Sequence, residues 1–233
     1  MIPYDFTVVD LETTGLNPKT DKIIEIGAVK VKDGMIRGKF QCYVNPGRKL
    51  EERIIELTGI CDEDIIEAKS IEEVLPELFA FIGEDILVGH RILFDYSFLK
   101  KAAVNQKLSF EKQGIDTLKI ARKFLPDLES RRLPFLCEYY GIALKAHRAM
   151  HDALATAELY LKLAKEFSDE EAFKPLPLIY KAKKEGPVTP RQKEQLYKLI
   201  EKHKLTVDYE VDKLTKNEAS RQIDKILFRY GRG

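Results

Sequence analysis

The sequence lacks the features that would mark a membrane protein, a secreted disulfide protein or a cysteine-ligated zinc protein. It has no apolar run of about 18 residues, which a membrane-spanning helix requires. Its N-terminus has no basic stretch followed by an apolar one, as a secretory signal would. The three cysteines, Cys42, Cys61 and Cys137, form no CxxC pair, and their odd number argues against a disulfide framework. We therefore expect a cytoplasmic protein with no membrane partner.

What remains is an ordinary globular composition with an uneven distribution of charge. The 233 residues are 44% hydrophobic and 33% charged, contain no tryptophan, and carry a net charge of +1. Residues 1–173 have 24 Lys or Arg and 30 Asp or Glu, whereas residues 174–233 have 15 and 8. An acidic body with a basic tail indicates that the tail meets a polyanion. A drift of surface charge along the chain is the alternative.

Hydrophobic periodicity predicts an α/β fold with a mixed sheet. Strands are expected at residues 6–10, 22–32, 35–44, 86–89 and 114–116, and helices at 70–82, 94–104, 117–124, 133–140 and 149–167. Asp33-Gly34 is a hairpin turn between the second and third strands. Ser70 and Glu73 have the spacing of a capping box, and Asp116 can cap the helix that follows it. Three strands followed by alternating helices and short strands are typical of this fold class.

The pattern changes after about residue 168. Prolines and a lysine cluster in residues 169–188 predict a linker between a domain at 1–168 and a basic two-helix module at 189–233. Thr189 and Thr215 each begin a helix with a capping box. About 45 residues is near the lower limit for independent folding. We therefore expect this small C-terminal helical hairpin to dock on itself, on the body or on a partner.

The strongest local signal is Asp10-Leu11-Glu12 at the end of a buried strand. Alternation along a strand projects Asp10 and Glu12 from the same face. Burying carboxylates costs free energy unless a cation pairs with them, and two hard oxygen ligands suit Mg²⁺ or Mn²⁺. A solvated strand end followed by a turn at residues 13–15 is the alternative.

Two more carboxylates fall at corresponding places. Asp95 opens a helix after the strand that leads to His90, although a helix-start Asp bonded to backbone N–H groups is the alternative. Asp152 enters a long amphipathic helix. Five helical positions rotate a side chain by about 140°, so His147 can approach Asp152 only from the loop before the helix. His147 and His151 could instead form a zinc pair, but the Glu of HExxH and cysteine partners are missing.

The order and spacing of these residues resemble the three motifs of the DEDDh 3′–5′ exonucleases in the RNase H-like superfamily. The resemblance covers about residues 4–167 and is strongest to the proofreading epsilon subunit of bacterial DNA polymerase III and the exonuclease domain of Gram-positive replicative polymerases. Three accessory segments agree, at residues 23–29, 57–60 and 116–118. The resemblance implies an RNase H-like fold with a mixed five-stranded sheet flanked by helices.

It also implies an activity. The chain would hydrolyse phosphodiester bonds from the 3′ end of DNA, in proofreading or repair, and release nucleoside 5′-monophosphates. Asp10, Glu12, Asp95 and Asp152 would hold two divalent ions, Mg²⁺ or Mn²⁺, and His147 would take the proton of the attacking water. The implied partners are single-stranded or 3′-ended nucleic acid and, for proofreading, a separate DNA polymerase. From its own charge, the C-terminal module is expected to bind nucleic acid or a protein.

By the same resemblance, seven residues are expected to contact the substrate: Leu11, Thr13, Thr14, Leu16, Thr58, His90 and Phe94. Phe94 can equally be a core residue, and His90 can be merely supporting. Arg91 and Ile92 depart from the family, in which Asn and often a small residue follow the motif histidine. Arg91 is expected either to contact a phosphate or to point to solvent. Glu25, which the family shares, is expected to face solvent or to make a structural hydrogen bond.

Two other functions remain open on the sequence. The same motif set serves RNases, so 3′–5′ trimming of RNA is the closest alternative. A non-catalytic module that binds nucleic acid or a polymerase is a second, and the presence of all four carboxylates and His147 argues against it.

Overall fold

The computed structural model describes residues 1–207 and 209–231. Within those residues a six-stranded mixed sheet runs in the order β3-β2-β1-β4-β5-β6. The strands are β1 (Phe6–Thr13), β2 (Ile23–Lys32), β3 (Met35–Tyr43), β4 (Leu87–Gly89), β5 (Gln113–Asp116) and β6 (Leu176–Pro177). β4 is parallel to β1 and β5, whereas the pairs β1–β2, β2–β3 and β5–β6 are antiparallel. The predicted α/β fold with a mixed sheet is confirmed.

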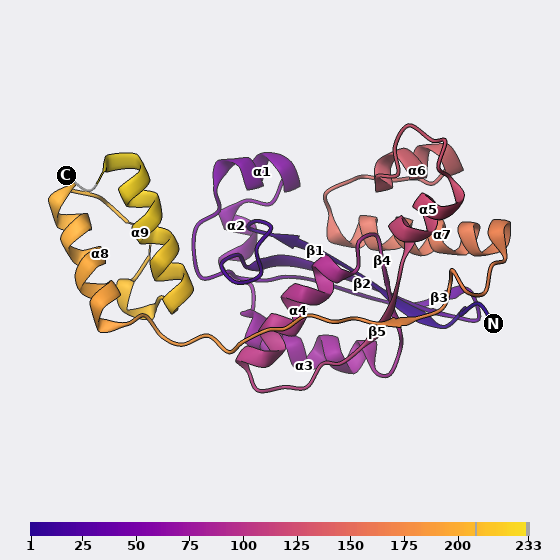
Figure 1. The fold of residues 1–233 in the computed structure, drawn as a ribbon, viewed down its shortest axis with the longest axis horizontal. Helices are drawn as coiled ribbons and strands as arrows, with labels where there is room; N and C mark the ends of the chain where they lie inside the picture. The colour runs from indigo at the N-terminus through magenta and orange to yellow at the C-terminus, as the bar shows by residue number, and fades with distance from the viewer. Residues whose placement is uncertain (208, 232–233) are drawn as a thin grey trace.

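Helices cover both faces of this sheet (Figure 1). They are α1 (Glu52–Thr58), α2 (Asp62–Ile65), α3 (Ile71–Ile82), α4 (Leu93–Asn105), α5 (Thr117–Phe124), α6 (Leu133–Tyr140), α7 (Ala149–Phe167), α8 (Pro190–Lys202) and α9 (Lys216–Tyr230). One core joins Phe6 and Val8 of β1 to α5, α6 and α7, and a second joins Val9 and Leu11 to α3 and α4. The side chains of β1 thus contribute to both cores. Asp10 and Glu12 project from this central strand. None of the described helices is both long and apolar enough to cross a bilayer.

The segment predicted as a linker adds a sixth strand, so the expected five-stranded sheet is one strand short. β6 pairs with β5 at the edge of the sheet, and the Leu178 backbone N–H donates to the Lys112 carbonyl at 2.9 Å. Farther along, Lys101 and Glu185 form an ion pair at 3.2 Å in which each side chain is only 8% exposed. Prolines favour a loop assignment, but an edge strand tolerates them because its outer N–H groups have no ladder partner.

The two C-terminal helices enclose a hydrophobic cluster of their own, which includes Leu196, Ala219 and Ile223 and shares no residue with the cores of the body. Both predicted capping boxes, at Thr189 and Thr215, are present. Figure 1 shows the pair at one end of the molecule, joined to β6 by an extended segment that runs along the body. The module therefore packs first on itself.

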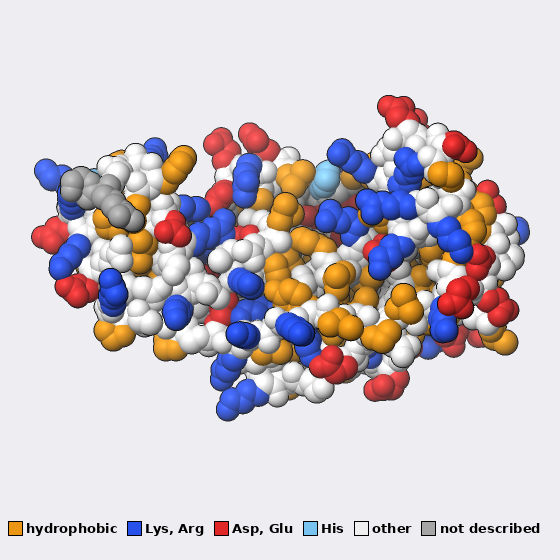
Figure 2. Space-filling view, in the orientation of Figure 1, with side chains coloured by type: hydrophobic (Ala, Val, Ile, Leu, Met, Phe, Trp, Pro, Cys, Tyr) orange, Lys and Arg blue, Asp and Glu red, His pale blue; other side chains and the backbone are white. Residues whose placement is uncertain are grey.

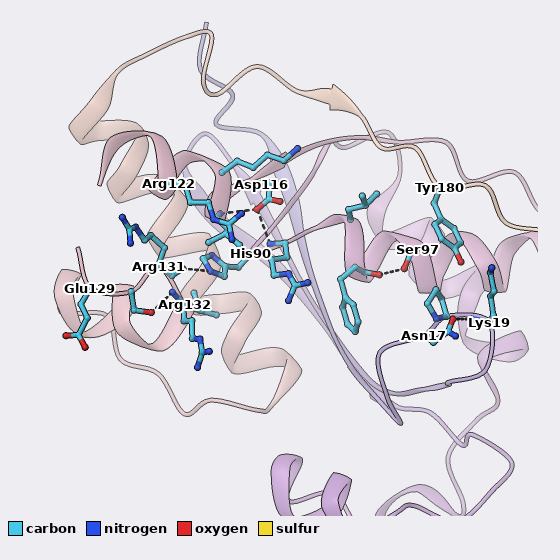
Figure 3. A pocket seen from close by; sticks show the side chains of 18 residues that line it. Asn17, Lys19, His90, Ser97, Asp116, Arg122, Glu129, Arg131, Arg132 and Tyr180 are labelled. Carbon is cyan, nitrogen blue, oxygen red and sulfur yellow. Dashed lines mark hydrogen bonds between the residues drawn. The ribbon is translucent and has the colours of Figure 1, made fainter. Parts of the chain in front are cut away.

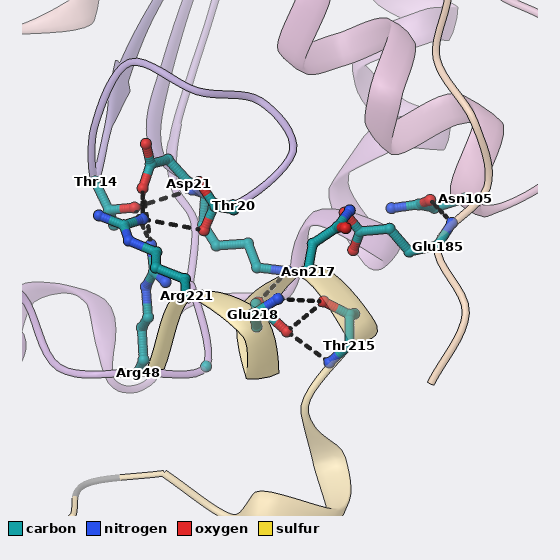
Figure 4. Close-up of polar contacts among 12 residues, drawn as sticks. Thr14, Thr20, Asp21, Arg48, Asn105, Glu185, Thr215, Asn217, Glu218 and Arg221 are labelled. Carbon is teal, nitrogen blue, oxygen red and sulfur yellow. Dashed lines mark hydrogen bonds and ion pairs between the residues drawn. The ribbon is translucent and has the colours of Figure 1, made fainter. Parts of the chain in front are cut away.

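The contacts that hold this module against the body are ionic. Arg221 of α9 and Arg48 of the body converge on Asp21, whose side chain is 5% exposed (Figure 4). Lys22 pairs with Glu218 at 2.9 Å, and a further lysine of α9 pairs with Glu51 at 2.6 Å. Asp21 also accepts a hydrogen bond from the backbone of the loop after β1. The module is thus linked through one buried carboxylate to the loop that borders the acidic residues.

Candidate active site

Three carboxylates from two elements come together at one end of β1. The strand projects Asp10 and Glu12 from the same face, as predicted, and Asp152 enters from the first turn of α7. One carboxylate oxygen from each lies within 4.8 Å of the others. They line a cavity of about 520 Å³, and Asp95 and His147 line it as well. The structure therefore gathers all five residues of the predicted motifs around one cavity.

A glycine on the neighbouring strand lets α7 approach this closely. Gly27 of β2 lies opposite Asp10 in the strand register. A Cβ atom on Gly27 would lie 2.3 Å from the carbonyl carbon and oxygen of Ala149, at the start of α7. Because such a contact is impossible, a side chain here would push the helix away from the sheet. Gly27 thus sets the depth at which Asp152 enters the cluster.

Asp95 is oriented by the strand that carries the other acids. Its side chain is buried, and its Oδ1 accepts a hydrogen bond from the Leu11 backbone N–H at 3.0 Å. The carboxylate therefore turns from the start of α4 toward β1, and it also accepts a hydrogen bond from its own backbone N–H. It lines the cavity of the three-carboxylate cluster and repels the charge of Asp10.

Proximity and burial leave these acids electrostatically unsatisfied. Burial, and then the charges of Asp95 and Asp152, hold the pKa of Asp10 well above its usual range. Burial and the nearby Asp152 raise the pKa of Glu12 to about 8. Burial also raises the pKa values of Asp95 and Asp152, although backbone hydrogen bonds oppose it in both. A cation among these oxygens would remove the repulsion, and hard oxygen donors at this spacing fit a divalent metal.

Glu25 forms the support for the His147 loop. It is fully buried and accepts hydrogen bonds from Arg148 Nε at 3.3 Å, Arg148 Nη2 at 3.2 Å and the Ala149 backbone N–H at 3.1 Å. Arg148 Nη2 also donates to the Tyr43 hydroxyl at 2.8 Å. His147 itself is exposed, in the left-handed region at φ 65°. Of the two expectations for Glu25, a structural hydrogen bond is right and solvent exposure is wrong.

His90 lies between the cavity and the loop before α6. Its Nε2 is 2.9 Å from the Arg131 carbonyl, and its Nδ1 is 2.9 Å from the Thr117 hydroxyl. Burial lowers the pKa of His90 and favours the neutral ring. A carbonyl only accepts, so Nε2 carries the proton and Nδ1 accepts from Thr117. Both ring nitrogens are engaged, and the imidazole connects two segments of chain rather than offering a free ligand.

The predicted substrate residues divide into two groups. Five of the seven line the cavity: Leu11, Thr13, Leu16, His90 and Phe94. Thr14 and Thr58 do not. The Thr14 hydroxyl accepts from the Lys22 backbone and from Arg48, and the Thr58 hydroxyl donates to the Ile54 carbonyl at 2.8 Å. Both residues are buried and their hydroxyls are committed to the protein, and the substrate contacts expected of them stay predictions.

Several lining residues were not anticipated from the sequence: Arg53, Ile54, Leu57, Leu133, Pro134 and Ala146. Leu57 is 52% exposed and Leu16 is 83% exposed, so the cavity has apolar side chains that the core leaves uncovered. The signal for Leu57 was its place directly before Thr58 in a segment shared with the family. Helical geometry turns these neighbours to different sides, and Leu57 is the one that faces outward.

Comparisons with known proteins agree with this geometry. A family model described as "Exonuclease" matches residues 7–160. The DNA polymerase III subunit epsilon of Aquifex aeolicus is 39% identical over 163 residues, which cover 69% of this chain and 81% of that protein. The PolC-type DNA polymerase III of Bacillus subtilis is 43% identical over 169 residues, or 71% of this chain. The match covers only 12% of that polymerase's length.

A solved structure shares the fold. The nuclease domain of 3′hExo, described as a DEDDh family member bound to rAMP, superposes with a TM-score of 0.63 at 20% identity. The superposition covers 74% of this chain and 96% of that domain. The expected RNase H-like architecture of the DEDDh exonucleases is therefore confirmed. The match to the family model ends at residue 160 and leaves residues 161–233 uncovered.

Proposed function

The chain belongs to the exonuclease family, and from this membership we propose that it is a metal-dependent 3′–5′ exonuclease acting on DNA. It would hydrolyse the terminal phosphodiester bond and release nucleoside 5′-monophosphates. The observation that carries the proposal is the gathering of Asp10, Glu12, Asp95, Asp152 and His147 around one cavity. Burial raises the pKa values of all four acids, and neighbouring carboxylates raise those of Asp10, Glu12 and Asp95 further, so a purely structural role for them would only destabilise the fold.

The carboxylates of the cluster are the proposed metal ligands. Asp10, Glu12 and Asp152, with Asp95 beside them, would hold two divalent ions, for which we propose Mg²⁺ or Mn²⁺. When bound, such ions activate water and neutralise charge on the scissile phosphate. Asp95 is fixed by the Leu11 backbone, so its carboxylate keeps one orientation. Rigid placement of ligands is what in-line attack on a phosphate requires.

His147 is the proposed general base. Its side chain is exposed and lines the cavity, so it can reach a water molecule beside the cluster. The next two residues are anchored to Glu25, which holds the loop from behind while the imidazole stays free. Imidazole accepts protons near neutral pH, which suits this role.

The apolar side of the cavity fits the terminal nucleoside. Leu16, Leu57 and Phe94 surround it with hydrocarbon and one aromatic ring. A base can stack or pack on such surfaces whatever its identity, as a sequence-independent exonuclease needs. The Leu11 backbone and Thr13 would complete the contacts to sugar and phosphate.

DNA is the proposed substrate because both polymerase III relatives are named for DNA polymerases. A cytoplasmic location and a separate polymerase as the partner in proofreading follow from this proposal. Trimming of RNA is the second candidate, and the rAMP-bound structural neighbour is the observation that favours it.

We also propose that residues 1–168 are the catalytic domain and that the helical module supplements the grip on nucleic acid. A hollow of about 730 Å³ lies between body and module. Its lining includes five cations: Lys22, Arg48, Lys49, Lys213 and Lys225. Three acids, Glu51, Glu210 and Glu218, reduce its net charge. Electrostatic binding to phosphates would make the contribution of the module sensitive to salt.

End-labelled single-stranded DNA and RNA of the same sequence test the main proposal. With Mg²⁺ or Mn²⁺ the protein should shorten 5′-labelled DNA stepwise and release 5′-monophosphates, and a chelator should stop the reaction. Faster degradation of RNA would move the assignment to the second candidate. Absence of metal-dependent degradation of either would refute both.

A further inference from the structure

A second, larger hollow opens beside the catalytic cavity (Figure 3). Its volume is about 1130 Å³, and it is lined by the loop after β1, the start of α4, the start of α5, the segment before α6 and Tyr180. Four residues line both spaces: His90, Arg91, Phe94 and Leu133. The two spaces therefore adjoin, and a chain leaving the catalytic cavity on this side would meet the second hollow.

This hollow is basic although the body around it is acidic. Its lining contains six cations, Lys19, Arg91, Lys119, Arg122, Arg131 and Arg132, and two acids, Asp116 and Glu129. Figure 2 shows Lys and Arg side chains gathered over α5 and α6. In Figure 3 three arginines, Arg122, Arg131 and Arg132, lie on one side of the space, opposite Asn17, Lys19 and Tyr180. We call this space the basic hollow.

Most of these positive charges are not used by the protein. Arg131 donates to the carbonyls of Leu125 and Pro126 and is therefore structural. Within residues 1–207 and 209–231, no ion pair or side-chain hydrogen bond engages the charged groups of Lys19, Arg91, Lys119, Arg122 and Arg132. Unpaired cations around a concave surface concentrate a positive potential there, which attracts a polyanion.

One of the two acids is committed to the backbone. Asp116 accepts hydrogen bonds from the Leu118 and Arg91 backbone N–H groups, both at 3.0 Å. The second of these bonds fixes Arg91 in the left-handed region at φ 75°. Arg91 is exposed at the junction of the two cavities, where a phosphate that passes from one to the other would meet it.

We propose that the basic hollow binds the phosphates of the nucleotides upstream of the scissile bond, on the strand that is degraded. The inference rests on the proposed function, because the catalytic cavity must hold the 3′ end for the upstream nucleotides to lie here. Leu93, which is 48% exposed, and Phe94 and Tyr180 provide faces on which bases can lie. Cations interleaved with such faces are typical of single-strand binding.

Substrate length tests the proposal. The double variant Arg122→Ala/Arg132→Ala removes two free charges of the basic hollow that do not line the catalytic cavity. Its matched control is Arg37→Ala/Lys39→Ala, which removes two exposed charges from β3 at the opposite edge of the sheet. Single-stranded oligonucleotides of two to ten nucleotides are compared by kcat/KM. Binding of non-hydrolysable phosphorothioate oligonucleotides is measured separately by fluorescence anisotropy.

In the double variant, the loss of kcat/KM and of binding affinity should grow with the length of the oligonucleotide. For the double variant we expect kcat/KM on a dinucleotide to fall by less than about twofold. Binding of a decanucleotide should be about tenfold weaker, and the slope of log affinity against log salt concentration should be smaller by about 1.4. The control should follow the wild type. An equal loss for dinucleotide and decanucleotide would overturn the proposal, as would an unchanged length dependence. A loss seen only with a recessed duplex would assign the hollow to the complementary strand instead.

The two proposals fail in different ways. If the wild type degrades no oligonucleotide, the proposed function fails. The anisotropy measurement still shows whether the basic hollow distinguishes long strands from short ones, because it needs no turnover.

Discussion

The raised pKa of Glu12 makes a prediction that needs no substrate. In the folded, metal-free protein the pKa of this carboxyl is about 8, against an ordinary value of 4.5, because of burial and the charge of Asp152. Between those two pH values the folded chain binds a proton that the unfolded chain has released. Linkage then requires the stability of the folded state to fall as pH rises from about 4.5 to 8. At about 1.4 kcal/mol per pKa unit, the whole interval amounts to about 5 kcal/mol.

Thermal unfolding in chelator between pH 5 and pH 8 measures this effect. The wild-type Tm should fall across the range, whereas Glu12→Gln should have a flatter profile and a higher Tm at pH 8. The control is Glu72→Gln, whose carboxyl is exposed on α3 and whose profile should match the wild type. Mg²⁺ or Mn²⁺ should raise the wild-type Tm more at pH 8 than at pH 5, since carboxylates bind metal when deprotonated.

One result would refute the reasoning. If the metal-free wild type has the same Tm at pH 5 and pH 8, and Glu12→Gln follows the same profile, the acids do not share a repulsive site. The electrostatic argument for a metal at this cluster would then be lost.

Four other predictions follow from single contacts. His147→Ala should lower kcat by about 10² to 10⁴ while the metal-induced rise in Tm persists, whereas Asp10→Ala should abolish that rise; the reverse pattern would contradict the proposed base. Glu25→Gln should lower kcat through the His147 loop and destabilise the fold by about 1–3 kcal/mol, and a change in stability with no change in kcat would contradict its positioning role. Gly27→Ala should displace α7 and weaken metal binding, which titration calorimetry would measure. An unchanged affinity for the metal would contradict this role of Gly27. Arg221→Ala should make the segment before α8 as sensitive to protease at low salt as the same segment of the wild type is at high salt. Unchanged protease sensitivity would mean that apolar contacts hold the module.

Local rules were sufficient for the residues whose placement depends on one element. Alternation along β1 puts Asp10 and Glu12 on one face regardless of what packs beside them. Asp116 caps α5 through the Leu118 N–H, as its place before the helix predicts. Thr189 begins α8 with the predicted capping box. In each case the partner lies within three residues in the sequence, so the pattern contains the whole interaction.

The sequence did not identify partners that lie far away along the chain. The Thr14 hydroxyl accepts a hydrogen bond from Arg48, 34 positions away, and the sequence did not predict this contact. Glu25 interacts with Arg148, 123 positions away. β6 was missed for the same reason, because an edge strand of two residues exists only through its pairing with β5. Nothing in one sequence specifies which of many cations or strands will lie beside a given position.

The positive charge of the tail shows why composition alone overstates binding. Residues 174–233 carry seven more cations than acids, but Arg221 and Lys225 are directed at Asp21 and Glu51 of the body. Those charges are already neutralised and cannot also bind phosphate at full strength. The acidic body, in contrast, has five cations around the basic hollow that form no ion pair with any residue the structure describes. Affinity for a polyanion depends on unpaired charge at a concave surface, so the basic hollow should contribute more to strand binding than the more basic tail.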